Sequence, residues 1–229
     1  MGQLTPTFLW QMENILGIYA LPYDESRPLW CFAGALWARP CQLIGDTLVP
    51  LPIEPGKPQR RDYESGALWA RHGVCSVLLA VQPHTGLSFV QVRDQRTALD
   101  YAEFMAALVA AHCPVGGQIV LVQDNLNTHT PAAFYQAFSP EHAFALMQQL
   151  DMHYTPKKAS WLNMAEIQLS VLSKQCLKRR IPTVTALTRE VLAWTRRRNQ
   201  KPVPIHWQFT PQMARIKFKR FYPNPSLLQ

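Results

Sequence analysis

The chain has 229 residues, of which 48% are apolar and 17% charged, a composition typical of a folded globular protein that excludes overall disorder and a coiled coil. The mean hydropathy of −0.12, with no unbroken apolar stretch of about 20 residues, excludes a membrane span. Five scattered cysteines without a Cys-x-x-Cys pair argue against a zinc knuckle or a disulfide framework and predict a reducing cytoplasm, and no secretory signal is expected.

The net charge of +8 is concentrated in the last third of the chain. Residues 1–150 carry a net −4, whereas residues 151–229 carry 15 basic and 3 acidic residues, a net +12. Any single basic cluster is compatible with a solvated face. A whole segment of this charge favours a polyanionic partner, and nucleic acid is the usual one. The basic residues expected to bind DNA are Lys157, Lys158, Lys178, Arg179, Arg180, Arg196, Arg197 and Arg198.

The spacing of apolar residues and the positions of proline, glycine and capping residues predict the elements of the first half of the chain. The ranges, in order, are a helix over 8–19, a strand over 29–32, a proline-rich loop over 50–58, a hairpin of 75–82 and 87–92, and a helix from Thr97 to His112. Thr97 with Asp100 three residues later is a variant of the capping box that begins a helix.

In the second half, the apolar run 119–122 predicts a strand buried on both faces. Thr130-Pro131 and Ser139-Pro140 each place a capping residue before proline and predict two short helices. A strand over 152–155 and helices over 162–178 and about 185–199 follow. This order predicts an α/β fold, a mixed sheet with helices packed on it.

Asp124 directly follows the buried strand, where open α/β sheets place their ligands. Asn125, Asn127 and His129 follow within the polar stretch and could orient a metal-bound water or a phosphate. A polar loop that leads into the next helix explains the same residues equally well. Glu166, in the first turns of a largely apolar helix, either favours the helix N-terminus or shares a divalent cation with Asp124.

Three segments carry a resemblance to a known family. They are DNLNTHT at 124–130, HYTPKKASWLNMAEIQLSVLSKQCLKRRIP at 153–182, and the closing pattern W-x-F-T-x-x-x-A-R-x-K-x-K-R-x-Y-P from Trp207. Together they resemble the catalytic half of bacterial insertion-sequence transposases of the DDE superfamily, in the branch related to mariner elements. The resemblance covers about residues 8–223 and implies a ribonuclease-H-like fold, a mixed sheet with helices on both faces.

The resemblance implies metal-dependent DNA strand cleavage and transfer. Asp124 matches the family's second catalytic aspartate and Glu166 its closing acid, so both are the expected catalytic residues and ligands of Mg²⁺ or Mn²⁺. Asn125, Asn127, His129 and Asn163 are the expected supporting residues. The implied partners are transposon-end and target DNA, bound by a homodimer without a membrane, in the bacterial cytoplasm with the nucleoid.

One departure from the family pattern concerns the first catalytic aspartate. The family has an Asp-Glu pair after Cys-Phe, where this chain has the acid-free residues Ala33–Ala38. The segment Gly34–Arg39 recurs identically at Gly66–Arg71, and nothing else in the chain repeats. Because Mg²⁺ is held mainly by hard oxygen ligands, loss of a carboxylate predicts impaired catalysis.

We therefore expect one catalytic domain over residues 1–223 and a tail over 224–229, without the helix-turn-helix region that reads the transposon ends. Whether the chain is an active enzyme stays open at this stage. The alternative is a non-catalytic remnant that binds DNA or interacts with a transposase. An acid reaching the folded site near Ala33 would discriminate the two.

Overall fold

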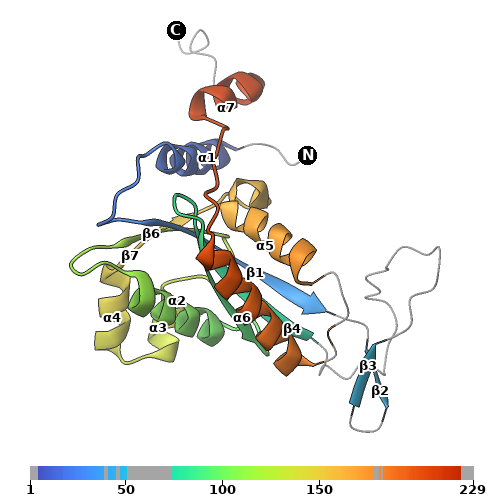
Figure 1. The fold of residues 1–229 in the computed structure, drawn as a ribbon. Helices are drawn as coiled ribbons and strands as arrows, with labels where there is room; N and C mark the ends of the chain where they lie inside the picture. Colours follow the sequence, from blue (N-terminus) through green and yellow to red (C-terminus); the bar gives the residue numbers. More distant parts are fainter. Residues whose placement is uncertain are drawn as a thin grey trace, which may run out of the picture.

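The computed structural model describes residues 5–38, 41–44, 47–50, 74–177, 181 and 183–222. Its main element is a five-stranded mixed sheet with strand order β5-β4-β1-β6-β7 (Figure 1). The pairs β1–β4 and β4–β5 are antiparallel, and β1–β6 and β6–β7 are parallel. The strands are β1 (Leu29–Ala38), β4 (Val74–Gln82), β5 (Leu87–Arg93), β6 (Ile119–Gln123) and β7 (Leu150–Tyr154). A separate two-stranded sheet pairs β2 (Cys41–Ile44) with β3 (Thr47–Pro50).

Helices cover both faces of the main sheet, as the sequence predicts. One core cluster joins one face of the strands to α1 (Pro6–Tyr19), α5 (Met164–Gln175) and α6 (Val184–Gln200). The other cluster joins the opposite face to α2 (Ala98–His112), α3 (Ala132–Ala137) and α4 (Pro140–Gln148). Because side chains alternate along a strand, successive residues of β1 enter different clusters, with Cys31 and Ala33 in the first and Phe32 in the second.

Local capping accounts for several helix starts. Thr97 and Asp100 form a full capping box at α2, and Ser139 accepts a hydrogen bond from the backbone of His142 at α4. The cap expected from Thr130 is wrong. Pro131 precedes α3 in helical conformation without a side-chain cap, and the backbone N–H of Ala133 bonds instead to the carbonyl of Thr130 at 3.0 Å.

Three element boundaries differ from the sequence-based expectation. The strand β1 runs to Ala38 instead of ending at residue 32, because its added residues continue the antiparallel ladder to β4. The strand β7 begins and ends earlier than the predicted 152–155, since its register pairs Leu150 with Ile119. The helix α5 is shorter than 162–178: a short 3₁₀ turn, η2 (Ser160–Leu162), comes first, and Asn163 caps the helix. The proline-rich loop over 51–58 and the second repeat, Gly66–Arg71, lie outside the described residues.

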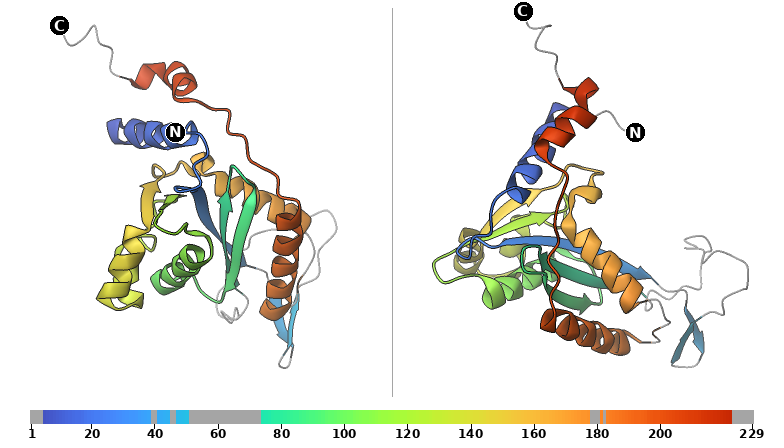
Figure 2. Two further views of the ribbon diagram at one scale, coloured as in Figure 1. Left: turned by 60° about the vertical axis from the view of Figure 1, so that its left-hand side comes forward. Right: turned by 45° about the horizontal axis from the view of Figure 1, so that its top comes forward.

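After α6 the chain runs in an extended segment, residues 201–210, to α7 (Pro211–Lys217) and the short turn η3 (Lys219–Phe221). This segment passes the β4–β5 hairpin, where the backbone N–H of Ile205 donates to the carbonyl of Pro83 at 2.9 Å. The helices α7 and α1 lie side by side at one end of the molecule (Figure 2), joined by an ion pair between Arg215 and Glu13. Among the described residues, none of the helices has the length and apolarity needed to cross a bilayer.

Candidate functional site

Ala33, within β1, and Asp124, directly after β6, each follow the last register pair of these two strands. These strands are parallel neighbours, and their last register pair joins Phe32 to Gln123, so the next residues on the two strands are Ala33 and Asp124. Ala33 belongs to the core cluster on the α5 face, as does Val122, two residues before Asp124. The alternation of side chains therefore directs position 33 and Asp124 toward the same face. Ala33 is fully buried and has no polar group to offer there.

Asn163 joins three parts of this site. Its side-chain amide donates to Asp124 Oδ1 at 3.0 Å and to the backbone carbonyl of Phe32 at 2.8 Å. Its Oδ1 accepts from the backbone N–H of Ala165 at 3.0 Å and so caps α5. Because Asn163 is only 1% exposed, these bonds fix the start of α5 against β1 at Phe32 and against the residue that follows β6. The supporting role expected of Asn163 stays a prediction, and these hydrogen bonds are the contacts on which it depends.

Glu166 lies one turn into α5 and shares an electrostatic environment with Asp124. Its pKa is raised, first by burial and then by the negative charge of Asp124, while the positive charge of Arg96 opposes the rise. Two acids that are 42 positions apart in the sequence are therefore near enough in the fold for the charge of one to affect the pKa of the other. The side chain is half-buried, at the start of the helix that Asn163 anchors.

His129 is buried beside the site, whereas Asn125 and Asn127 are exposed. The His129 ring stacks on Tyr101 at 4.9 Å between centroids and meets the edge of Phe32 at 5.1 Å. Burial and the charge of Arg96 lower the pKa of His129 to about 4, so its ring is neutral at pH 7. Among the described residues, no hydrogen bond joins the side chain of Asn125 or Asn127 to the carboxylate of Asp124. Of Asn125, Asn127 and His129, only His129 has a buried side chain.

Arg96, which the sequence analysis did not single out, reaches the same region. It follows β5 and immediately precedes Thr97, the residue that caps α2. A Cβ on Gly34, the residue after Ala33, would lie 3.4 Å from Arg96 Nε.

The donors of this site do not fit a two-metal centre. Within the described ranges no group of three or more His, Cys, Asp or Glu side chains could hold a metal ion. Asp124 and Glu166 supply two carboxylates, but position 33 is alanine and Arg96 brings a positive charge to the region. Two divalent ions spaced about 3.5–4 Å apart need more hard oxygen donors than this pair provides.

The basic residues expected to bind DNA lie in separate places. Lys157 and Lys158 are exposed in the turn that follows β7, at one edge of the sheet. Arg196 and Arg197 are exposed on α6, which packs against β5 at the opposite edge. Arg198 is half-buried on the same helix, and Lys178, Arg179 and Arg180 lie outside the described residues.

Two comparisons identify relatives of the chain. Residues 49–188 match the sequence profile of a family described as DDE superfamily endonuclease. The structure is similar to the pre-cleavage Mos1 transpososome, with a TM-score of 0.54 at 12% identity over 97% of this chain and 65% of that chain. It is also similar to the Mos1 strand transfer complex, with a TM-score of 0.52 at 12% identity over 82% of this chain and 53% of that chain.

A third similar structure is the Mos1 mariner paired end complex with Mn, with a TM-score of 0.52 at 12% identity, covering 85% of this chain and 56% of that chain. The chain thus spans between half and two thirds of the length of these relatives. No curated protein sequence matches the chain. At such low identity the likeness shows the fold alone, and the predicted ribonuclease-H-like fold is confirmed.

Proposed function

The chain belongs to the DDE superfamily endonucleases, and on that premise we propose that it is the catalytic domain of a bacterial insertion-sequence transposase, in the mariner-related branch, with impaired strand cleavage. The domain comprises residues 1–223 and acts on transposon-end and target DNA as a homodimer in the cytoplasm, with the nucleoid. The family match supports the class of protein, and the resemblance of the segment around Asp124 and Glu166 supports the finer assignment.

The observation that carries the proposal is alanine at position 33. The register of β1 and β6 sets this residue level with Asp124, on the face that α5 covers. By resemblance, the family's first catalytic aspartate stands after Cys-Phe, which is this position. An aspartate at position 33 would lie on the same face of the sheet as Asp124 and Glu166. With alanine at this position, Asp124 and Glu166 are the two carboxylates proposed for the site.

The catalytic roles of Asp124 and Glu166 are part of this proposal, as are the supporting roles of Asn125, Asn127, His129 and Asn163. Mg²⁺ or Mn²⁺ is the ion class that carboxylates of such a site would bind, because both prefer hard oxygen ligands. Since the donors present do not fit a two-metal centre, we assign no cleavage step to the chain as it stands.

Restoring the acid tests the proposal. Supercoiled plasmid is incubated with the unchanged chain, with Ala33→Asp and with Ala33→Asn, each in Mg²⁺, Mn²⁺ or chelator. We expect nicking only from Ala33→Asp and only with metal, because asparagine has the same size without the charge. Adding Asp124→Asn to the Ala33→Asp variant should abolish the gain.

Stability provides a second measurement for the same variants. A carboxylate at the buried position 33 lies beside Asp124, so Ala33→Asp should unfold at a lower temperature than the unchanged chain in chelator. Bound divalent metal should recover part of that loss by mass action. Strong metal-dependent nicking by the unchanged chain would contradict the impairment, and nicking that survives Asp124→Asn would contradict the site.

The rival function is a non-catalytic remnant that binds DNA or interacts with a transposase. It predicts DNA binding with no gain of nicking from Ala33→Asp, even where the variant is folded and binds metal. Both functions share the DNA-binding step, so that step is tested separately.

DNA binding should depend strongly on salt, because each phosphate neutralised by Lys or Arg contributes about −0.9 to the slope of log affinity against log salt. Titration of a labelled duplex at several salt concentrations measures the slope. Replacing Arg196 and Arg197 by glutamine should flatten it by about 2, and replacing the exposed Arg189 on the same helix provides the matched control. A slope that the double variant leaves unchanged would show that these two side chains are only a solvated face.

A further inference from the structure

We propose that Trp161, Phe209 and Lys217 form a stacking site for an unpaired nucleobase of a DNA strand. The three residues come from η2, from the extended segment 201–210 and from α7, and ring and cation contacts join them in the fold. The inference rests on the proposed function only in taking DNA as the ligand. It adds a base-binding site that neither the candidate acids nor the arginines of α6 supply.

Trp161 presents an exposed indole on a rigid support. Its side chain is 46% exposed, whereas the next two residues, Leu162 and Asn163, are buried. The hydroxyl of Tyr19 donates to the carbonyl of Leu162 at 2.7 Å, and the Asn163 side chain bonds to Asp124 and to β1. Because these contacts hold the backbone that carries the indole, a ligand that stacks on it has little protein ordering to offset.

Phe209 supports the indole from the extended segment. The two ring centroids lie 5.8 Å apart with the planes at 66°, so Phe209 does not occupy the indole as a parallel stacking partner. Phe209 is itself held, because the indole N–H of Trp207 donates to its carbonyl at 2.8 Å and the next residue, Thr210, caps α7. Every nucleobase has a flat π-face, so an open, braced indole is suited to stack on one.

Cations beside the rings make the site complementary to a nucleotide and not to a neutral apolar group. Lys217 is exposed, and its Nζ lies 5.6 Å from the centroid of the Phe209 ring. Lys157 and Lys158 are exposed in the turn that leads into η2. Each nucleotide of a strand carries one planar base and one negative phosphate, and sites for single-stranded DNA combine aromatic rings with basic side chains in the same way.

The stacking site lies near the candidate acids. Asn163, which donates to Asp124 at 3.0 Å, comes two residues after Trp161, and a 3₁₀ turn rises about 2.0 Å per residue. Phe209 packs against the core cluster on the α5 face of the sheet, the face toward which Asp124 is directed. In a paired duplex the bases are stacked inside the helix, so only an unpaired base can reach the indole. The expected ligand is therefore an unpaired base at a DNA end.

Two DNA ligands that differ only in their bases test the site. Each is a labelled duplex with a single-stranded overhang, made of thymidines in one and of abasic nucleotides in the other, so both carry the same phosphates. Overhangs of 3′ and of 5′ polarity are compared in separate pairs, and affinity for the full chain is measured by fluorescence anisotropy in chelator. At one polarity or both, we expect the thymidine overhang to bind about fivefold or more tightly, the lower end of what one base–aromatic stack contributes.

Variants of the indole identify the side chain responsible. Trp161→Ala should remove the preference for thymidine, and Trp161→Phe should keep part of it, because phenylalanine retains a smaller ring. Trp10→Ala is the matched control, since it removes a still more exposed indole, 67% against 46%, from α1 and should leave the preference unchanged. A preference that survives Trp161→Ala would overturn the assignment.

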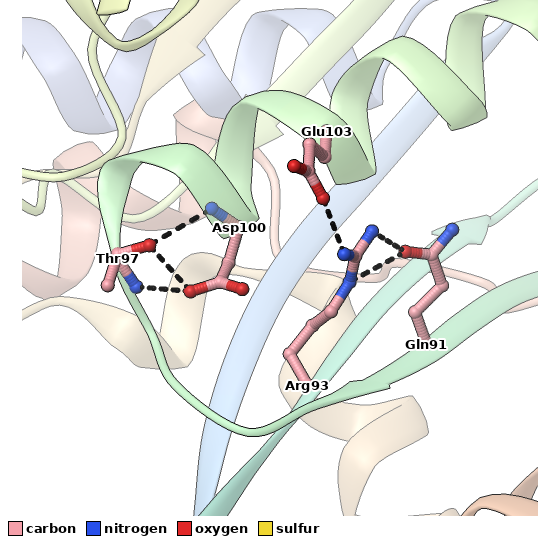
Figure 3. A network of polar contacts seen from close by, with 5 residues as sticks. All are labelled: Gln91, Arg93, Thr97, Asp100 and Glu103. Carbon is pink, nitrogen blue, oxygen red and sulfur yellow. Dashed lines mark hydrogen bonds and ion pairs between the residues drawn. The ribbon is translucent and has the colours of Figure 1, made fainter. Parts of the chain in front are cut away.

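Lys217 should act on the phosphates instead of the bases. Lys217→Gln should weaken both ligands by the same factor, because the two overhangs carry the same charge. Arg93→Gln also removes one positive charge, but Arg93 donates to Glu103 at 2.6 Å and to Gln91 at 2.7 Å (Figure 3), so both affinities should stay unchanged. Unchanged affinities in Lys217→Gln would overturn the place of Lys217 in the site.

Base fluorescence keeps the proposal testable if the Trp161 variants are unstable. 2-Aminopurine is placed in the overhang, and its emission is followed as the unchanged chain binds. Stacking on an aromatic ring should quench the emission, and a bound complex with unquenched emission would overturn the proposal.

The outcomes separate this inference from the proposed function. Equal affinity for the two overhangs would overturn the stacking site alone, because the basic residues would still bind DNA. If Trp161→Ala also weakened self-association, the rings would belong to a contact between two copies of the chain. Binding to neither ligand would overturn both proposals. No readout involves cleavage, so failure of the nicking experiment leaves this inference standing.

Discussion

The side chain of Asn163 donates a hydrogen bond to Asp124 at 3.0 Å, although the two residues are 39 positions apart. The same side chain caps α5 through the backbone N–H of Ala165 and bonds to the carbonyl of Phe32 on β1. One buried asparagine therefore sets the distance between the strand that ends at Asp124 and the helix that carries Glu166. The relationship between the two candidate acids depends on this residue.

Replacing Asn163 by alanine should lower the free energy of unfolding by about 2–4 kcal/mol. A lost helix cap contributes about 1 kcal/mol, and the buried carbonyl of Phe32 loses its side-chain donor, which costs about 1–3 kcal/mol more. Urea unfolding with an unchanged m-value measures the loss. The control is Asn127→Ala at an exposed position, expected to stay within about 0.5 kcal/mol. Equal losses in the two variants would show that Asn163 is not the anchor.

His129 should make stability depend on pH below 6.5. Because its folded-state pKa is about 4, below the ordinary histidine value of 6.5, the unfolded chain binds more protons between these values. The contribution of His129 is complete above pH 6.5 and is lost as pH falls toward 4, by on the order of 3 kcal/mol. Unfolding measured across this range should be less pH-dependent in His129→Phe. The exposed His142 provides the control, and a His129→Phe profile that parallels the unchanged chain would refute the assignment.

Gly86 should not tolerate alanine. Its φ of +80° is in the left-handed region, and an added Cβ would overlap the backbone of Val203 in the extended segment 201–210. We expect Gly86→Ala to destabilise the chain by about 2–3 kcal/mol and to expose this segment to proteolysis. Gly116 is the matched control, because it has a φ of +70° with nothing within 4 Å of the added Cβ, so alanine there should cost only about 1 kcal/mol. Equal losses would show that the overlap is relieved at no cost.

Lys158 offers a stabilising substitution. Its φ is 63°, a conformation that costs an ordinary side chain about 1 kcal/mol and that asparagine adopts more readily. Lys158→Asn should therefore raise the free energy of unfolding by about 0.5 kcal/mol. The neighbouring Lys157→Asn removes the same charge without relieving a left-handed backbone, so it should give no gain. A gain in both variants would point to charge relief instead of backbone strain.

Much of the fold could be predicted from the sequence because it rests on local signals. The buried strand before Asp124 follows from an unbroken apolar run, and all five residues of β6 are buried. The capping box of α2 and the hairpin are properties of a few neighbouring residues, so they are recognised without knowledge of the rest of the chain. The alternation of strands and helices then gives the mixed sheet with helices on both faces. That Asp124 and Glu166 share one site stays a prediction, made because each lies at a predictable end of its element.

The tertiary structure decided the features that depend on register and on packing between distant segments. Ala33 and Asp124 each come one residue after the last pair of the β1–β6 register, and no local pattern encodes that register. Arg96, from the segment between β5 and α2, lies against Gly34 of β1. Arg215 forms an ion pair with Glu13, 202 positions away, instead of joining a free basic cluster. The sequence determined which elements form and which residue types they carry, because backbone preference and apolar periodicity act over a few residues. Only the tertiary structure decided which charges face one another, because a Coulomb interaction depends on distance in space and not on separation along the chain.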